Sequence, residues 1–221
     1  MAPRKLTRSE KTRLHLFQVA TKLFNEKGYK VTTLSDIAKA ADVSTGTLYR
    51  YYPSKGDFLM RIGINSVDHL EEYAQKLPDD LPLIDAILEV MIEDVRGTLE
   101  IFFEDAEKGD DTPRHRVSEA RFAYSSEIYA SEDHLSIELE TRARLAKVYA
   151  GLIKKAKDRG EVRVKSDGEV HGQIIVAIYF AEFDKGMFNY DYPYAEKFRE
   201  KLEALFEGKL TQDAKGERND A

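Results

Sequence analysis

The spacing of the apolar residues is the feature that most constrains the fold of this chain. Apolar side chains recur every three or four positions along nearly its whole length, whereas no stretch shows the sustained alternation of a half-buried strand. Leu16, Ala20, Leu23 and Phe24, for example, share one face of a helix predicted over residues 9–27. The sequence therefore predicts an all-α protein of about nine helices.

Capping residues and helix breakers place the remaining boundaries. The hydroxyls of Thr33 and Ser44 can each cap the free amides of a short helix, and Asp42 between these helices tolerates left-handed backbone. Pro53 ends the second short helix. A loop is expected over residues 104–112, and further helices are expected over residues 54–75, 84–103, 113–130, 135–159, 167–189 and 193–208.

The net charge of −6 conceals two parts of opposite sign. Residues 1–62 contain twelve Lys or Arg and five Asp or Glu (net +7), which leaves 22 and 35 of the totals of 34 and 40 for the remainder (net −13). A basic module on an acidic body is typical of a protein of which one part meets a polyanion. A solvated surface of uneven charge gives the same totals, so charge alone leaves both interpretations open.

Composition and motifs argue against several other classes of protein. The chain has no Cys, which excludes disulfides, thiolate zinc sites and iron–sulfur clusters. Its five His are scattered, and it has neither a Gly-rich phosphate loop nor a nucleophile elbow, so we expect no metal, no cofactor and no enzymatic activity. Apolar runs such as residues 174–181 are far shorter than the ~20 residues of a membrane span, and the N-terminus has no signal-type stretch, so we expect a cytoplasmic protein.

Three short helices in the first 52 residues, the last two joined by a turn of about four residues, have the layout of a helix-turn-helix DNA reader. At about 100° per residue, an inward Leu48 turns Gly46, Tyr49 and Arg50 outward. A glycine there lets the helix backbone approach a groove, an arginine can bind guanine edges or phosphate, and a tyrosine hydroxyl can bind phosphate. The pattern therefore favours DNA binding.

Residues 33–55, with the sequence TLSDIAKAADVSTGTLYRYYPSK, resemble the DNA-binding signature of the TetR family of transcriptional regulators. Residues 20–24 and 28–29 fit that family's first helix. Asp42 stands where the family often has Gly, and Tyr52 where Phe is frequent; both are sterically reasonable. The resemblance covers about residues 9–60, and the rest agrees only in being helical and of suitable length.

The resemblance implies a helix-turn-helix DNA-binding domain (1–54), a connecting helix (55–76) and a helical effector-binding and dimerisation domain (77–210). A tail over residues 211–221 lacks an apolar face and is expected to be disordered. The implied function is a dimeric repressor that binds a palindromic operator in double-stranded DNA and is released by a small-molecule effector, although the family also contains activators. The alternatives are an all-α protein-binding scaffold and an enzyme with an unrecognised site, and both leave the basic N-terminal part unexplained.

The resemblance also assigns the expected DNA contacts. We expect base contacts from Thr45, Gly46 and Thr47, phosphate contacts from Tyr49, Tyr51 and Lys55, helix caps that touch phosphate at Thr33 and Ser44, and either kind of contact from Arg50. Three of these residues also have a purely structural interpretation. Thr33 can be only a helix cap, Tyr51 a packing residue and Lys55 a solvated charge.

An effector pocket among the middle helices is expected from aromatic density and from the resemblance. Its lining would come from some of Phe102, Phe103, Phe122, Tyr124, Tyr129, Tyr179, Phe180 and Phe183. Aromatic stripes at helical spacing are more often plain core, and this interpretation stays open.

Dimerisation is expected through the last two helices. The residues with the required spacing are Val170, Ile174, Ala177, Ile178, Ala181, Phe198, Leu202, Leu205 and Phe206. The same stripes could serve only the core of one protomer, but a palindromic operator requires a two-fold protein, which favours the dimer.

Overall fold

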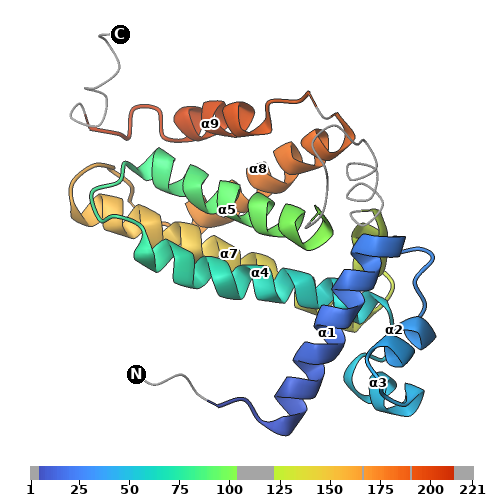
Figure 1. Cartoon of the computed structure of the whole chain (residues 1–221). Helices are drawn as coiled ribbons and strands as arrows, with labels where there is room; N and C mark the ends of the chain where they lie inside the picture. Colours follow the sequence, from blue (N-terminus) through green and yellow to red (C-terminus); the bar gives the residue numbers. More distant parts are fainter. Residues whose placement is uncertain (1–4, 104–121, 166, 190, 212–221) are drawn as a thin grey trace. The chain divides into compact units, whose positions relative to one another are not determined.

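The computed structural model describes residues 5–103, 122–165, 167–189 and 191–211; the side chains of residues 98–103, 187 and 188 are not among those described. In this part of the chain the helices are α1 (Arg8–Lys27), α2 (Leu34–Ala40), α3 (Thr45–Tyr51), α4 (Gly56–Lys76), α5 (Leu83–Phe103), α7 (Glu132–Asp158), α8 (Glu169–Phe188) and α9 (Tyr194–Leu205) (Figure 1). Residues 122–128 are helical as well.

These segments confirm the prediction of an all-α fold with about nine helices. Over the described residues, extended pairing is limited to one antiparallel bridge between Val162 and Leu210. The loop expected over 104–112, the first part of the helix expected over 113–130 and nearly all of the tail expected over 211–221 lie outside the described residues. No described helix is long and apolar enough to span a membrane.

Each of the three N-terminal helices begins at a side-chain cap, which confirms the caps predicted at Thr33 and Ser44. The hydroxyls of Thr7, Thr33 and Ser44 each accept a hydrogen bond from the amide three residues later, at 3.2, 3.1 and 3.1 Å. Each bond satisfies one of the N–H groups that have no partner within the helix, which fixes the start of the helix. The left-handed backbone expected at Asp42 is present, with φ at 54°.

Two boundaries farther along the chain differ by three residues from the prediction. α7 begins at Glu132, ahead of the expected residue 135, because the hydroxyl of Ser131 accepts from the His134 amide at 3.1 Å and caps the helix. α9 ends at Leu205 rather than near residue 208, and the left-handed Gly208 follows it with φ at 70°.

The described chain divides into two compact units. The first, here called the head, comprises Met1–Gly63 and Gly97–Glu138; the second, here called the body, comprises Ile64–Arg96 and Leu139–Ala221. α4, α5 and α7 each contribute residues to both units.

Aromatic packing holds the short helices of the head together. The rings of Tyr52 and Phe58 stack with centroids 3.9 Å apart, and Phe24 meets Tyr29 and Phe58 edge-on at 5.0 and 6.2 Å. The Tyr52 hydroxyl donates to the Arg13 carbonyl at 3.2 Å, and burial raises the pKa of this tyrosine to about 12. This core fixes the end of α3 against α1 and the start of α4.

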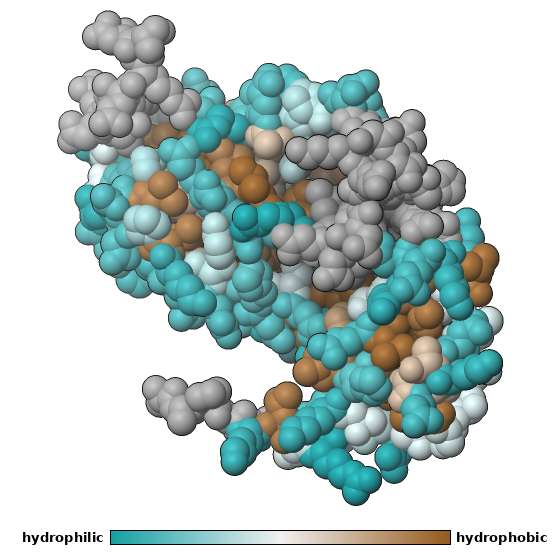
Figure 2. All heavy atoms as spheres, viewed as in Figure 1, coloured by the Kyte–Doolittle hydropathy of each residue, from teal (hydrophilic) through white to brown (hydrophobic). Residues whose placement is uncertain are grey.

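The body is a bundle of longer helices around a continuous apolar core. Its fully buried side chains come from α4, α5, α7, α8 and α9, among them Leu70, Ile87, Tyr149, Ile175, Phe198, Leu202 and Phe206. α7 and α8 approach closely at Gly172, where an added Cβ would lie 2.2 Å from the Ala146 carbonyl oxygen. Figure 2 shows hydrophilic residues over most of the face in view, with apolar residues gathered in patches.

Candidate nucleic-acid interface

The connection between α2 and α3 is a compact, hydrogen-bonded turn. The amides of Asp42 and Val43 donate to the carbonyls of Lys39 and Ala38 at 3.3 and 3.0 Å. The positive φ of Asp42 reverses the chain between these bonds. The segment α2–turn–α3 therefore has the helix-turn-helix geometry that the sequence predicts.

α3 has one buried and one exposed face. Leu48 is fully buried, while Thr45, Gly46, Tyr49 and Arg50 are exposed; we call these four residues the α3 outer face. Nearly half of the Tyr49 surface, 48%, is accessible. The α3 outer face thus presents a guanidinium group and a phenol to an external partner, and Gly46 leaves space between them.

Gly46 is not explained by the packing of the protein itself. A Cβ added at this position would have no atom within 4 Å, and the residue does not have positive φ. Glycine inside a helix costs about 0.5–1 kcal/mol relative to alanine. At this exposed position the absence of a side chain leaves room for an external partner to approach the helix backbone closely.

The cap residues combine a structural role with exposure. Thr33 donates its hydroxyl to the Asp36 carboxylate at 2.6 Å, and bonds from the side chain and backbone of Thr33 lower the pKa of Asp36. The hydroxyls of Ser44 and Thr47 lie 2.9 Å apart. Thr33 and Ser44 are exposed and Thr47 is partly exposed, so all three can also reach a partner at the helix starts.

Tyr51 lies between two guanidinium groups. Arg50 and Arg13 lie over its ring, with the guanidinium carbons 5.1 and 5.9 Å from the centroid. Hydrogen bonding from Ser9 first, and from Arg50 and Thr12, lowers the pKa of the Tyr51 phenol. The sequence analysis missed Arg13, which also lies 5.8 Å from the Tyr52 ring, because α1 supplies it from a distant part of the sequence.

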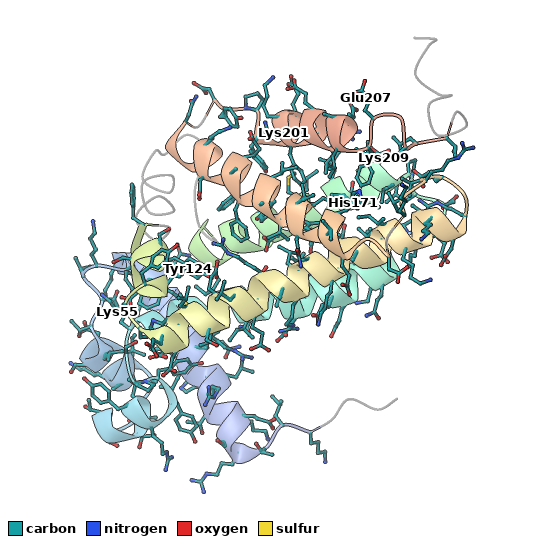
Figure 3. All side chains as sticks on the ribbon, turned by 180° about the vertical axis from the view of Figure 1, so that it is seen from behind. Lys55, Tyr124, His171, Lys201, Glu207 and Lys209 are labelled. Carbon is teal, nitrogen blue, oxygen red and sulfur yellow. The ribbon has the colours of Figure 1, made fainter. Side chains whose placement is uncertain are left out.

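Lys55, labelled in Figure 3, contacts other groups of the protein, whereas the residues of the α3 outer face are exposed. Its Nζ donates to the carbonyls of Tyr29, Thr32 and Lys30 at 2.8, 3.1 and 3.3 Å, and lies 4.3 Å from the centroid of the Tyr29 ring. The ammonium thus holds the connection between α1 and α2. A DNA contact by Lys55 stays a prediction.

The residues expected at an effector pocket are divided between the two units. In the head, Phe122 and Tyr129 are 59% and 79% exposed, and the hydroxyl of Tyr124 donates to the buried Glu138 carboxylate (Figure 3). In the body, the buried Tyr179 ring lies 5.1 and 5.7 Å from those of Phe180 and Phe183. The side chains of Phe102 and Phe103 lie outside the described residues.

A partly buried polar cluster in the body was missed by the sequence analysis, which had predicted only its member Tyr179 as a pocket residue. The Asp94 carboxylate of α5 accepts from the Tyr179 hydroxyl of α8 at 2.6 Å and from the Ser66 hydroxyl of α4. The fully buried Tyr149 hydroxyl of α7 has no hydrogen-bond partner among the described residues, and burial, followed by the charge of Asp94, raises the pKa of Tyr149. We call these four residues the Asp94 cluster. The four residues come from four different helices, so no local pattern reveals the cluster.

The residues expected at a dimer interface fall into two groups. Val170 and Ile174 are 57% and 39% exposed, and Ala177 and Ala181 are exposed beside them; we call these four residues the α8 outer face. Ile178 and Leu205 are partly buried. The side chains of Phe198, Leu202 and Phe206 are fully buried in the core of a single protomer.

No described part of the chain brings three or more His, Asp or Glu residues together in a way that could hold a metal ion. The ionisable side chains around His134 in the head form a hydrogen-bonded network with protein partners.

The N-terminal helices match a known family of sequences. The family model of bacterial regulatory proteins, tetR family, matches residues 16–62. The chain is 42% identical over 69 residues to the HTH-type transcriptional regulator HbdR of Aromatoleum sp. (strain CIB), which covers 31% of this chain and 29% of that protein. It is 34% identical over 103 residues to the HTH-type transcriptional regulator AcrR of Shigella flexneri, covering 45% and 47%. The chain thus spans less than half the length of these two relatives.

The fold of the whole chain matches solved structures. Thermus thermophilus FadR, a TetR family transcriptional repressor whose structure is in complex with lauroyl-CoA, superposes with a TM-score of 0.69 at 23% identity, over 90% of this chain and 95% of that one. Salmonella enterica GusR superposes with a TM-score of 0.60 at 21% identity, over 92% and 99%. Residues 16–62 of the head therefore match the tetR family of bacterial regulatory proteins, and the chain shares its fold with these solved structures.

Proposed function

We propose that this protein is a sequence-specific transcriptional regulator that binds a palindromic operator as a homodimer, represses transcription and is released by a small-molecule effector. The observation that carries the proposal is the α3 outer face, where an exposed arginine and tyrosine flank a glycine that the protein's own packing does not require. These features suit a helix inserted in a major groove.

In this arrangement some of the proposed DNA-binding residues contact base edges and others contact phosphate groups. Thr45, Gly46 and Thr47 would meet base edges, while Tyr49 and Tyr51 would bind phosphate and Arg50 either group. The net charge of +7 over residues 1–62 supports phosphate binding. Each phosphate neutralised releases counterions, so affinity should fall steeply as salt rises.

The α8 outer face supports the proposed dimer. Val170, Ile174, Ala177 and Ala181 follow helical spacing and present apolar surface to solvent in a single protomer. The same face on a second copy is self-complementary under two-fold symmetry, as an isologous interface requires. In such a dimer the two copies of α3, the proposed recognition helices, would lie about 34–36 Å apart, in successive major grooves.

The Asp94 cluster is the proposed polar end of an effector site in the body. A buried hydroxyl without a partner, such as that of Tyr149, costs about 1–3 kcal/mol and is satisfied when a ligand supplies the missing bond. Tyr179, Phe180 and Phe183 provide aromatic surface next to this cluster. We therefore expect an effector with an apolar or aromatic body and one polar group.

The effector would act by binding one of two conformations more tightly. Only one conformation would hold the recognition helices at the operator spacing, and a shift from almost fully bound to almost fully free requires about 5.5 kcal/mol of differential binding. The proposed relay is α4, which begins in the head beside α3 and supplies Ser66 to the Asp94 cluster.

Selection of bound duplexes from a random DNA pool, at two salt concentrations, tests this function. We expect an inverted repeat and a strong loss of affinity at the higher salt concentration. Binding without any base preference would contradict the regulator, and recovery of a single half-site would contradict the dimer.

A further inference from the structure

A buried histidine of the head is enclosed by oxygen atoms that can only accept hydrogen bonds. His134, near the start of α7, is 7% exposed. Its Nδ1 lies 3.0 Å from the Glu127 carbonyl oxygen, and its Nε2 lies 3.4 Å from the Asp57 carboxylate. A neutral imidazole carries one N–H, so it can satisfy one of these acceptors, whereas an imidazolium can donate to both.

Asp57 connects this histidine to the end of the helix-turn-helix. The other oxygen of its carboxylate accepts from the Ser54 amide at 2.6 Å and from the Ser54 hydroxyl at 2.7 Å. Ser54 stands between the end of α3 at Tyr51 and the start of α4 at Gly56. A contact from His134 to Asp57 therefore acts on the segment that sets where the recognition helix ends.

Glu127 connects the same histidine to the loop between α1 and α2. Its carboxylate accepts from the Tyr29 hydroxyl at 3.3 Å and lies 3.8 Å from Nδ1 of His134. Burial and the neighbouring Glu127 and Asp57 carboxylates raise the pKa of Tyr29, so its phenol stays a donor. Lys55 holds the backbone of the same loop through three carbonyls.

The backbone of α4 is built to let this network close. A Cβ at Gly56 would lie 2.1 Å from a Glu127 carboxylate oxygen and 2.9 Å from Cε1 of His134. Any larger residue at position 56 would displace the Glu127 side chain. The glycine therefore has a packing reason here, in contrast to Gly46 on the α3 outer face.

We propose that His134 and Glu127 are positioning residues for DNA binding, which form a proton-dependent latch on the helix-turn-helix. The inference rests on the proposed DNA-binding function. In the closed latch an imidazolium at His134 donates to Asp57 and to the Glu127 carbonyl, which holds the α3–α4 connection. Loss of the proton leaves one of these two acceptors without a donor and opens the latch.

The sign of the effect follows from these contacts. The charged groups that face His134 are Asp57 on α4 and Glu127 on the segment before α7, with Tyr29 and Lys55 behind Glu127. The protonated ring can donate to both acceptors and the neutral ring to only one, so the closed latch belongs to the protonated form and is lost as the pH rises.

The matched variants are His134→Gln, which removes the titratable ring at the latch, and His69→Gln, which makes the same change at an exposed histidine paired with Glu93 in the body. Affinity for a duplex selected as above is measured from about pH 5.5 to 8.5 at constant ionic strength. We expect wild type and His69→Gln to lose affinity by about fivefold or more as the pH rises, and His134→Gln to lack this component. Equal pH profiles for wild type and His134→Gln would overturn the latch.

A second readout does not depend on DNA. In NMR titrations of the free protein, the backbone amides of Ser54 and Asp57 should shift with the same midpoint as the His134 ring in wild type, and lose that transition in His134→Gln. If no duplex binds at any pH but this coupling is present, the proposed DNA binding fails and the latch stands as a structural device. If duplexes bind and the coupling is absent, the latch fails.

Discussion

The head and the body place their candidate functional groups in opposite environments. The head presents Tyr49 and Arg50 on the exposed side of a helix only seven residues long, which Ser44 starts and Leu48 anchors. The body holds Asp94 and Tyr149 inside a bundle of helices of twelve residues or more. The exposed groups of the head are positioned by local sequence, whereas the polar cluster of the body exists only after distant helices pack.

The largest effect is expected in the core of the body. Phe198→Ala should lower the free energy of unfolding by about 3–5 kcal/mol, because it empties a fully buried aromatic site in one protomer. Chemical denaturation of the dimer and of a dilute monomer should give similar losses. A loss of unfolding free energy seen only in the dimer would indicate that Phe198 lies at the interface between protomers.

The α8 outer face should behave differently from that core. Ile174→Glu should weaken dimerisation by at least tenfold while each protomer stays folded, because two like charges would face each other across the two-fold axis. Gln173→Glu adds the same charge at the neighbouring exposed position and serves as the control. Sedimentation of both variants measures the association, and an unchanged Ile174→Glu dimer would move the interface elsewhere.

Substitutions at Arg50 and Lys55 should affect different properties of the head, DNA affinity in the first case and folding stability in the second. Arg50→Ala should lose about 1–3 kcal/mol of specific DNA affinity with little change in melting temperature, since the side chain is exposed. Lys55→Ala should instead destabilise the head by about 1–3 kcal/mol, because three carbonyls lose their donor. DNA titration measures the affinity of both variants, and thermal melting measures their stability. If Lys55→Ala lost DNA affinity without losing stability, Lys55 would be assigned to phosphate binding.

The smallest effect sharpens the interpretation of Gly46. Gly46→Ala should raise the stability of the head by about 0.5–1 kcal/mol and at the same time weaken DNA binding, because the new methyl group projects from the α3 outer face. Gly151→Ala on α7 is the matched control, since its Cβ position is also open. It should gain similar stability without losing DNA affinity. Equal DNA affinity in both variants would remove Gly46 from the interface.

The sequence predicted the head well because its signals are local. Thr33, Ser44 and Asp42 determine caps and a turn through contacts within three residues, and Leu48 fixes which side of α3 is buried. Arg13 was missed because only tertiary packing brings it to Tyr51. Ser131 was missed as a cap, which misplaced the start of α7.

The body resisted prediction for a physical reason. Periodicity gives one apolar stripe to a helix, but Phe198 on a buried stripe and Ile174 on an exposed one have the same pattern in sequence. Ser66, Asp94, Tyr149 and Tyr179 come from four helices, and no spacing along the chain connects them. The latch at His134 has the same character, since Tyr29, Asp57 and Glu127 are separated by long stretches of sequence.

The most direct test of the proposed function is a stoichiometric DNA titration. Purified protein is titrated with the selected inverted repeat and with a duplex in which one half-site is scrambled, at one physiological salt concentration. The account predicts two protomers per intact duplex and an affinity at least about 10³-fold above that for unrelated DNA, with a large loss when one half-site is scrambled. Equal affinity for the intact, half-scrambled and unrelated duplexes would contradict it.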